Sequence, residues 1–82
     1  MPHVVAAGGD CGLFAAGATE FDVSAATVGE MIRELEARHP GLGDYIERRM
    51  AVAIDGEIHQ DAHGARLRPQ SEVYLIPKIG GG

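Results

Sequence analysis

One segment in the middle of the chain has a clear helical pattern, and it restricts the folds that the sequence can adopt. Thr27-Val28-Gly29-Glu30 is a capping box, in which the Thr27 hydroxyl can accept from the Glu30 amide and the Glu30 carboxylate can reach back. The apolar residues from the cap onward recur at helical spacing on one face: Val28, Met31, Ile32 and Leu35. Pro40-Gly41 then stops the helix. We therefore predict one main amphipathic helix whose apolar face packs on a sheet.

The segments on either side of this helix have the patterns of short strands. Residues 3–7 and 19–23 precede it, and residues 51–54, 57–60 and 72–77 follow it. Asp55-Gly56 suits a tight two-residue turn between the first two of the later strands. Leu42, Tyr45 and Ile46 indicate a short second helical turn. The order strand, strand, helix, short helix, hairpin and strand predicts an α+β fold.

The last strand is apolar on both faces. By the two-residue period, Val73 and Leu75 lie on one face and Tyr74 and Ile76 on the other. Such a strand suits a central position in a sheet, and its second face is either covered or used for binding. We assign Val73 and Leu75 to the core, together with residues of the other strands: Val4, Phe21, Val23, Val52 and Ile54.

Length and composition limit the function. A chain of 82 residues forms one domain with a small core, which leaves little room for a deep pocket and argues against an enzyme that acts alone. The formal net charge is −5 and the basic residues are scattered, so we expect a basic protein surface as partner rather than nucleic acid. A single cysteine, no signal-peptide pattern at the N-terminus and no long apolar run together predict a soluble cytoplasmic protein that contacts no membrane.

The chain ends in Gly80-Gly81-Gly82, directly after the last strand. Glycines at this place contribute no packing, so a frayed end is the simplest explanation. A functional explanation has three supports: the strand projects the terminal carboxylate from a rigid body, Pro77 restricts the chain where it leaves, and nothing follows Gly82. Because glycine has no Cβ, a partner enzyme can close tightly around such a tail. We expect Gly81 and Gly82 to be mobile and accessible.

These residues resemble the ThiS/MoaD family of sulfur carriers, which is structurally related to ubiquitin. The resemblance is most specific in residues 72–82, where an acidic residue, an apolar strand, a proline and a terminal Gly-Gly follow one another. The helix opening at Thr27, the Asp55-Gly56 hairpin and the anchor Leu67 also match the family's layout. The resemblance implies a β-grasp (ubiquitin-like) fold in residues 1–78, a mixed sheet of about five short strands over one main helix, followed by a flexible Gly tail at 79–82.

The resemblance also implies a mechanism. An ATP-using enzyme of the ubiquitin-activating type adenylates Gly82, a sulfur donor converts it to a thiocarboxylate, and the sulfur passes to a biosynthetic partner such as the large subunit of molybdopterin synthase. The length and the helical segment near Leu42 look closer to the molybdopterin type than to the thiamin type. The chain would then be a carrier or a synthase small subunit that binds no cofactor itself. Two alternatives stay open: a ubiquitin-like modifier joined to proteins through the same carboxylate, and a non-catalytic β-grasp interaction module.

We expect a docking surface beside the tail. Tyr74 and Ile76 would be exposed apolar residues next to a reactive group, which suggests a partner contact. Ile79 would anchor the tail as it enters a partner's channel, and Lys78 would pair with an acidic group there. Phe14 is a candidate extension of this patch.

Three further residues have chemistry that we interpret as structural. Cys11 has no charged helix end or histidine beside it in the sequence, so we read it as a small residue rather than a nucleophile. His59 and His63, with Asp61 between them, have a spacing that could hold a metal. They span a strand end and a loop and offer too few ligands, so we predict no metal site.

Overall fold

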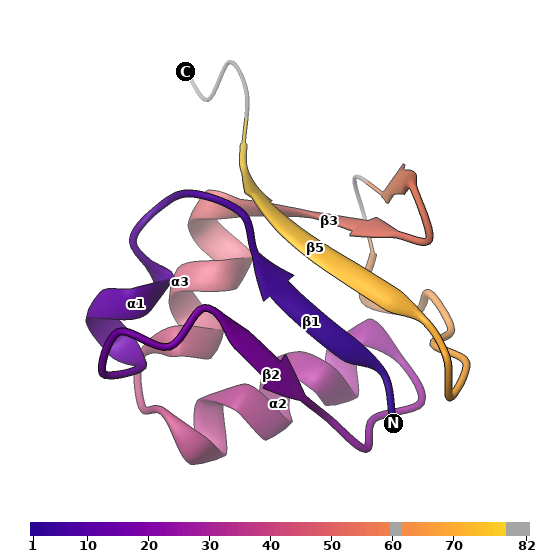
Figure 1. Cartoon of the computed structure of the whole chain (residues 1–82), viewed down its shortest axis with the longest axis horizontal. Coiled ribbons are helices and arrows are strands. Elements are labelled where there is room, and N and C mark those ends of the chain that lie inside the picture. Colours follow the sequence, from indigo (N-terminus) through magenta and orange to yellow (C-terminus); the bar gives the residue numbers. More distant parts are fainter. Residues whose placement is uncertain (60–61, 79–82) are drawn as a thin grey trace.

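The computed structural model describes residues 1–59 and 62–78 (Figure 1). Its elements, in chain order, are β1 (His3–Ala6), α1 (Cys11–Phe14), β2 (Glu20–Asp22), α2 (Val28–Arg38), α3 (Leu42–Arg49), β3 (Met50–Ile54), β4 (Glu57–His59) and β5 (Glu72–Pro77). The five strands form one mixed sheet in the order β2-β1-β5-β3-β4, in which only β1 and β5 run parallel. The last strand is therefore central, as its two apolar faces predicted, and the α+β class is confirmed.

Helix α2 begins at the predicted cap. The Glu30 amide donates to Thr27 Oγ1 at 3.2 Å, as the capping box requires. In a capping box the Glu30 carboxylate would accept from the amide of Thr27, but here it accepts from the amide of Ala26 at 3.1 Å. All four residues of the predicted stripe are buried, and Leu35 has no exposed area. The helix is thus fixed by one local cap and by burial of its apolar face against the sheet.

The core lies between the sheet and the helices, which cover one face of the sheet (Figure 1). Every strand residue assigned to it from the sequence is buried: Val4, Phe21, Val23, Val52, Ile54, Val73 and Leu75. The predicted anchor Leu67 is buried as well. Its amide donates to the carbonyl of Ala26 at 2.8 Å, so the long loop before β5 is tied to the start of α2.

Helix α3 is longer than the single turn predicted. It has eight residues, and its first turn is capped by Glu36, a residue of α2. The Glu36 carboxylate accepts from the amides of Gly41 and Gly43, both at 2.9 Å, and these bonds hold its pKa below the ordinary value. Gly43 lets the two helices approach closely, because a Cβ there would lie 2.9 Å from the Ile32 carbonyl oxygen.

The segment between β1 and β2, where no element was predicted from the sequence, contains the short helix α1. Phe14 at its end packs against the ring of Tyr45 on α3, with ring centroids 5.2 Å apart. The hairpin between β3 and β4 has the expected two-residue turn, with positive φ angles of 50° at Asp55 and 87° at Gly56. Within the described residues, no helix is long and apolar enough to span a bilayer.

Candidate functional site

The site predicted from the sequence begins where β5 ends. Its reactive group, Gly82, lies outside the described residues, as do Gly80, Gly81 and Ile79. Lys78 is the last residue that the structure describes. The described part of the site begins at the two residues where β5 ends and the chain leads to the tail in sequence, Pro77 and Lys78, which we call the tail root.

The tail root is attached to the C-terminal end of α3. The Lys78 amide donates to the Arg49 carbonyl at 2.9 Å, and its ammonium nitrogen donates to the Glu47 carbonyl at 2.8 Å. The last carbonyls of a helix have no partner within the helix and carry partial negative charge, so a lysine there supplies both a donor and a favourable charge. The tail root is thus held by the strand pairing on one side and by a helix end on the other.

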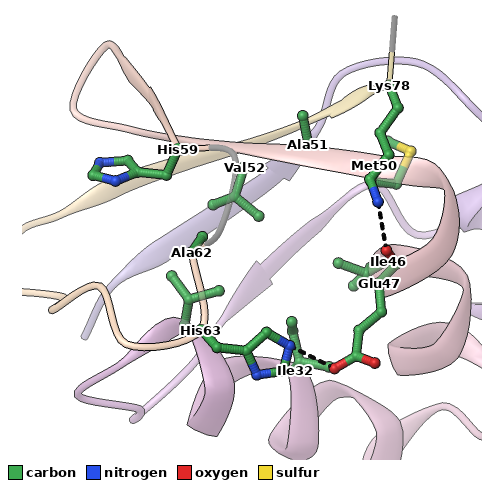
Figure 2. Close-up of a pocket in the computed structure, with 11 residues that line it drawn as sticks. Ile32, Ile46, Glu47, Met50, Ala51, Val52, His59, Ala62, His63 and Lys78 are labelled. Atoms are coloured by element: carbon green, nitrogen blue, oxygen red, sulfur yellow. Dashed lines mark hydrogen bonds and ion pairs between the residues drawn. The ribbon is translucent and has the colours of Figure 1, made fainter. Parts of the chain in front are cut away.

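The same residue Glu47 links the tail root to the start of α2. Its carboxylate contacts His63 Nε2 at 2.7 Å, and the His63 carbonyl accepts from the Gly29 amide at 2.9 Å (Figure 2). Between these groups is a cavity of about 280 Å³ with an apolar floor that includes Ile46 and Val52 and a polar rim formed by Glu47, His59, His63 and Lys78. Figure 2 shows that Lys78 and Glu47 approach it from the side of α3 and His63 from the loop.

The loop after β1 packs against the other side of the tail root. The Ala7 amide donates to the Leu75 carbonyl at 2.8 Å, and Gly8 then follows with a φ of 107°. A Cβ on Gly8 would lie 3.5 Å from the Pro77 ring. The Asp10 amide donates to the Tyr45 hydroxyl at 2.8 Å, which fixes the loop to α3. The loop therefore flanks the point at which the chain leaves the sheet.

The sheet face away from the helices carries an apolar band that ends near the tail root. Tyr74 is 44 % exposed and Ile58 is 57 % exposed, whereas Ile76 is half-buried. Strand register places Val5, Tyr74, Ala53 and Ile58 in one row and Ile76 beside Ala51 in the next. We call these residues the open face: Val5, Ala51, Ala53, Ile58, Tyr74 and Ile76. The predicted alternation along β5 is confirmed.

Phe14 is not part of the open face. From the sequence it was a candidate extension of the Tyr74 patch, but it lies in the helical layer, where it packs on Tyr45 and against Gly41. The reason is that α1 folds towards α3, which local sequence does not reveal. Its neighbour Leu13 is 80 % exposed.

Three acidic residues surround His3 at the end of the open face that is opposite the tail root: Glu20, Asp22 and Glu72. His3 contacts Glu20 at 2.8 Å and Asp22 at 3.1 Å, both on β2, and pairs across the sheet with Glu72 on β5. The hydrogen bonds to Asp22 and Glu20 raise the pKa of His3 above its ordinary value. The open face thus has an acidic end.

The cysteine and two histidines that the sequence pointed to are Cys11, His59 and His63. Cys11 is 1 % exposed, and burial raises the pKa of its thiol, so it has the character of a core residue. His59 and His63 both line the cavity, but in the part of the chain that is described no three of His, Cys, Asp and Glu gather in a way that could hold a metal ion. Asp61, which lies between the two histidines in the sequence, is outside the described residues.

The fold is that of a ubiquitin-like β-grasp protein, as solved structures demonstrate. A chain of the Amycolatopsis orientalis BexX/CysO complex matches with a TM-score of 0.83, 20 % identity and full coverage of both chains. Mycobacterium tuberculosis CysO, described as an antigen, also gives 0.83, at 16 % identity over 96 % of this chain and 100 % of that one. SAMP1 from Haloferax volcanii gives 0.70 at 26 % identity, over 99 % and 98 % of the two chains.

The sequence places the chain within this class. The model of the ThiS family matches residues 13–82, which is most of the chain, and no curated protein sequence matches it. The protein belongs to the ThiS family of ubiquitin-like sulfur carriers. The family expected from the tail and the capped helix is therefore confirmed, and so is the β-grasp fold.

Proposed function

We propose that the chain carries sulfur on its own C-terminus and is the substrate of a separate activating enzyme. In this scheme the Gly82 carboxylate attacks the α-phosphate of ATP on the partner, pyrophosphate leaves, and a sulfur donor then displaces AMP to give a thiocarboxylate. The chain itself binds no cofactor, because ATP is held by the partner. The observation that carries the proposal is the tail root, where the central strand ends against α3 four positions before Gly82 in the sequence.

We propose further that the activating enzyme docks on the open face. Tyr74 and Ile76 lie on the strand that leads into the tail, so a partner that encloses the tail also reaches them. The acidic end around His3 and the net charge of −5 favour a partner surface that is basic. The solved complex of BexX with CysO supports the idea that a protein of this fold binds a second protein.

The acceptor of the sulfur is proposed as a precursor in cofactor biosynthesis, with a molybdopterin precursor as the first candidate. The support is the eight-residue helix α3 in the place where a helical segment was expected. Conjugation to lysines of other proteins is the second candidate, because it uses the same activated carboxylate. The recovered product separates the two: a free thiocarboxylate for the first and an isopeptide conjugate for the second.

The test of the carrier function is adenylation by an activating enzyme of the ubiquitin-activating type from the same source. ATP–pyrophosphate exchange should require the chain, and it should disappear when Gly81 and Gly82 are removed. The matched control is Cys11→Ser, which leaves the tail intact and should exchange at the wild-type rate. Exchange that persists without the two glycines would show that the tail is incidental and would favour a simple interaction module.

A further inference from the structure

The chain contains one lysine, Lys78, against six arginines. This residue stands four positions before Gly82, so its amine is the side-chain amine nearest in sequence to the proposed reactive carboxylate. Amines attack activated carboxylates: a C–N bond forms, the bond from the acyl carbon to the activating group breaks, and the amine proton leaves with that group. Arginine stays protonated in proteins and is no acceptor of this kind.

The amine of Lys78 forms a hydrogen bond within the protein. Lys78 Nζ donates to the Glu47 carbonyl at 2.8 Å, within the last turn of α3. The Lys78 amide is bound to the Arg49 carbonyl in the same turn, so both ends of the residue are attached to one helix end. The Glu47 carboxylate points away towards His63 (Figure 2), which leaves the carbonyl as the group that receives the ammonium.

We infer that Lys78, although exposed, is a clamp that holds the tail root to α3, and that this contact slows the reaction of its amine with the chain's own activated carboxylate. Attack by Lys78 on the activated tail, of the same chain or of a second copy, is therefore slower than attack by a lysine that no hydrogen bond holds. This inference rests on the proposed activation of Gly82, and it adds that acceptors on other molecules are favoured over Lys78. It also assigns Lys78 an intramolecular role in place of the acidic partner group expected from the sequence.

The first test measures how fast Lys78 is acylated by N-hydroxysuccinimidyl acetate, a small amine-reactive probe. The comparison is K78R/R33K, which keeps one lysine but moves it to the solvent-exposed Arg33 position on α2. The N-terminal amine is present in both proteins and serves as the internal standard. Because a hydrogen bond must break first, Lys78 should react about fivefold more slowly than Lys at position 33, and the two should become equal in denaturant. Rates within twofold of each other in the folded proteins would overturn the clamp.

The second test uses R33K, which has both lysines, prepared with a C-terminal thioester at Gly82. Self-reaction breaks the C–S bond, forms an amide and releases the thiol, and peptide mapping then locates the amide. The amide at Lys78 should form about fivefold more slowly than in a peptide of residues 77–82 with the same thioester, because the peptide lacks Glu47. Equal rates in the protein and the peptide would overturn the inference. Neither test contains the activating enzyme, so failure here is distinguishable from failure of the carrier function.

Discussion

The two faces of β5 have opposite environments within one strand. Val73 and Leu75 point into the helix-covered core and have no exposed area, whereas Tyr74 between them is 44 % exposed on the open face. The residues of both faces are large and apolar, so composition alone does not separate them. The helices cover Val73 and Leu75, so these two residues stabilise the fold. Tyr74 is left uncovered on the strand that leads to the tail, where a partner could contact it.

The largest expected effect is on the covered face. Leu35→Ala removes a fully buried side chain that packs the helix on the sheet, so the free energy of unfolding should fall by about 2–5 kcal/mol. Tyr74→Ala, on the open face, should cost less than about 1 kcal/mol. Chemical denaturation of both variants measures the contrast. Equal losses would mean that the open face is also part of the stabilising core.

The second effect concerns binding. Tyr74→Asp places a charge in the middle of the open face and removes the proposed contact between Tyr74 and the activating enzyme. Because a buried contact of this kind contributes about 2 kcal/mol, the affinity should fall at least ~30-fold. Ile76→Asp should act in the same direction. Thermal unfolding provides the control, because the Tyr74 variant should keep its fold. A folded variant that binds normally would remove the open face from the docking site.

A smaller effect should appear at acid pH. The amides of Gly41, Gly43 and Asp44 lower the pKa of Glu36 from its ordinary value of 4.5. The contribution of the ionised Glu36 carboxylate to the stability of the fold is therefore complete above that value, and it is lost as pH falls through the lowered pKa. Glu36→Gln should be less stable than wild type at neutral pH, and the gap should narrow below pH 4.5. The test is to measure the melting temperatures of both proteins across this pH range. A difference in melting temperature that is independent of pH would contradict the charge-assisted cap.

The smallest effect belongs to His3 on the exposed sheet surface. Bonds to Asp22 and Glu20 raise its pKa above the ordinary 6.5, so its contribution to stability is complete below 6.5 and disappears as pH rises through the raised value. His3→Gln should lower the melting temperature slightly at pH 6 and leave it unchanged well above the raised pKa. Proton NMR titration of the imidazole measures the pKa directly. An ordinary or lowered value would show that the carboxylates do not hold this ring in solution.

Local patterns predicted much of the fold. The Thr27 cap, the helical stripe and the Asp55-Gly56 turn each depend on a few neighbouring residues, and all three are present in the structure. The extent of α3 was missed because its cap comes from Glu36, a side chain of the preceding helix. Phe14 does not extend the Tyr74 patch, because the tertiary packing of α1 on Tyr45 decides where its side chain points.

The candidate site was predictable in part. The two-residue period along β5 identified Tyr74 as outward-facing, since alternation is a property of any strand. The bond from Lys78 to Glu47 was not predictable, because it joins residues 31 positions apart.

The most direct test of the account is the location of sulfur after reaction with the activating enzyme, ATP and a sulfur source. Tandem mass spectrometry of the C-terminal peptide should show one oxygen replaced by sulfur at Gly82, and Cys11→Ser should give the same product in the same yield. Cys11 is buried and burial raises the pKa of its thiol, so it should remain unmodified. Sulfur found on Cys11, with Gly82 unchanged, would contradict the carboxylate mechanism.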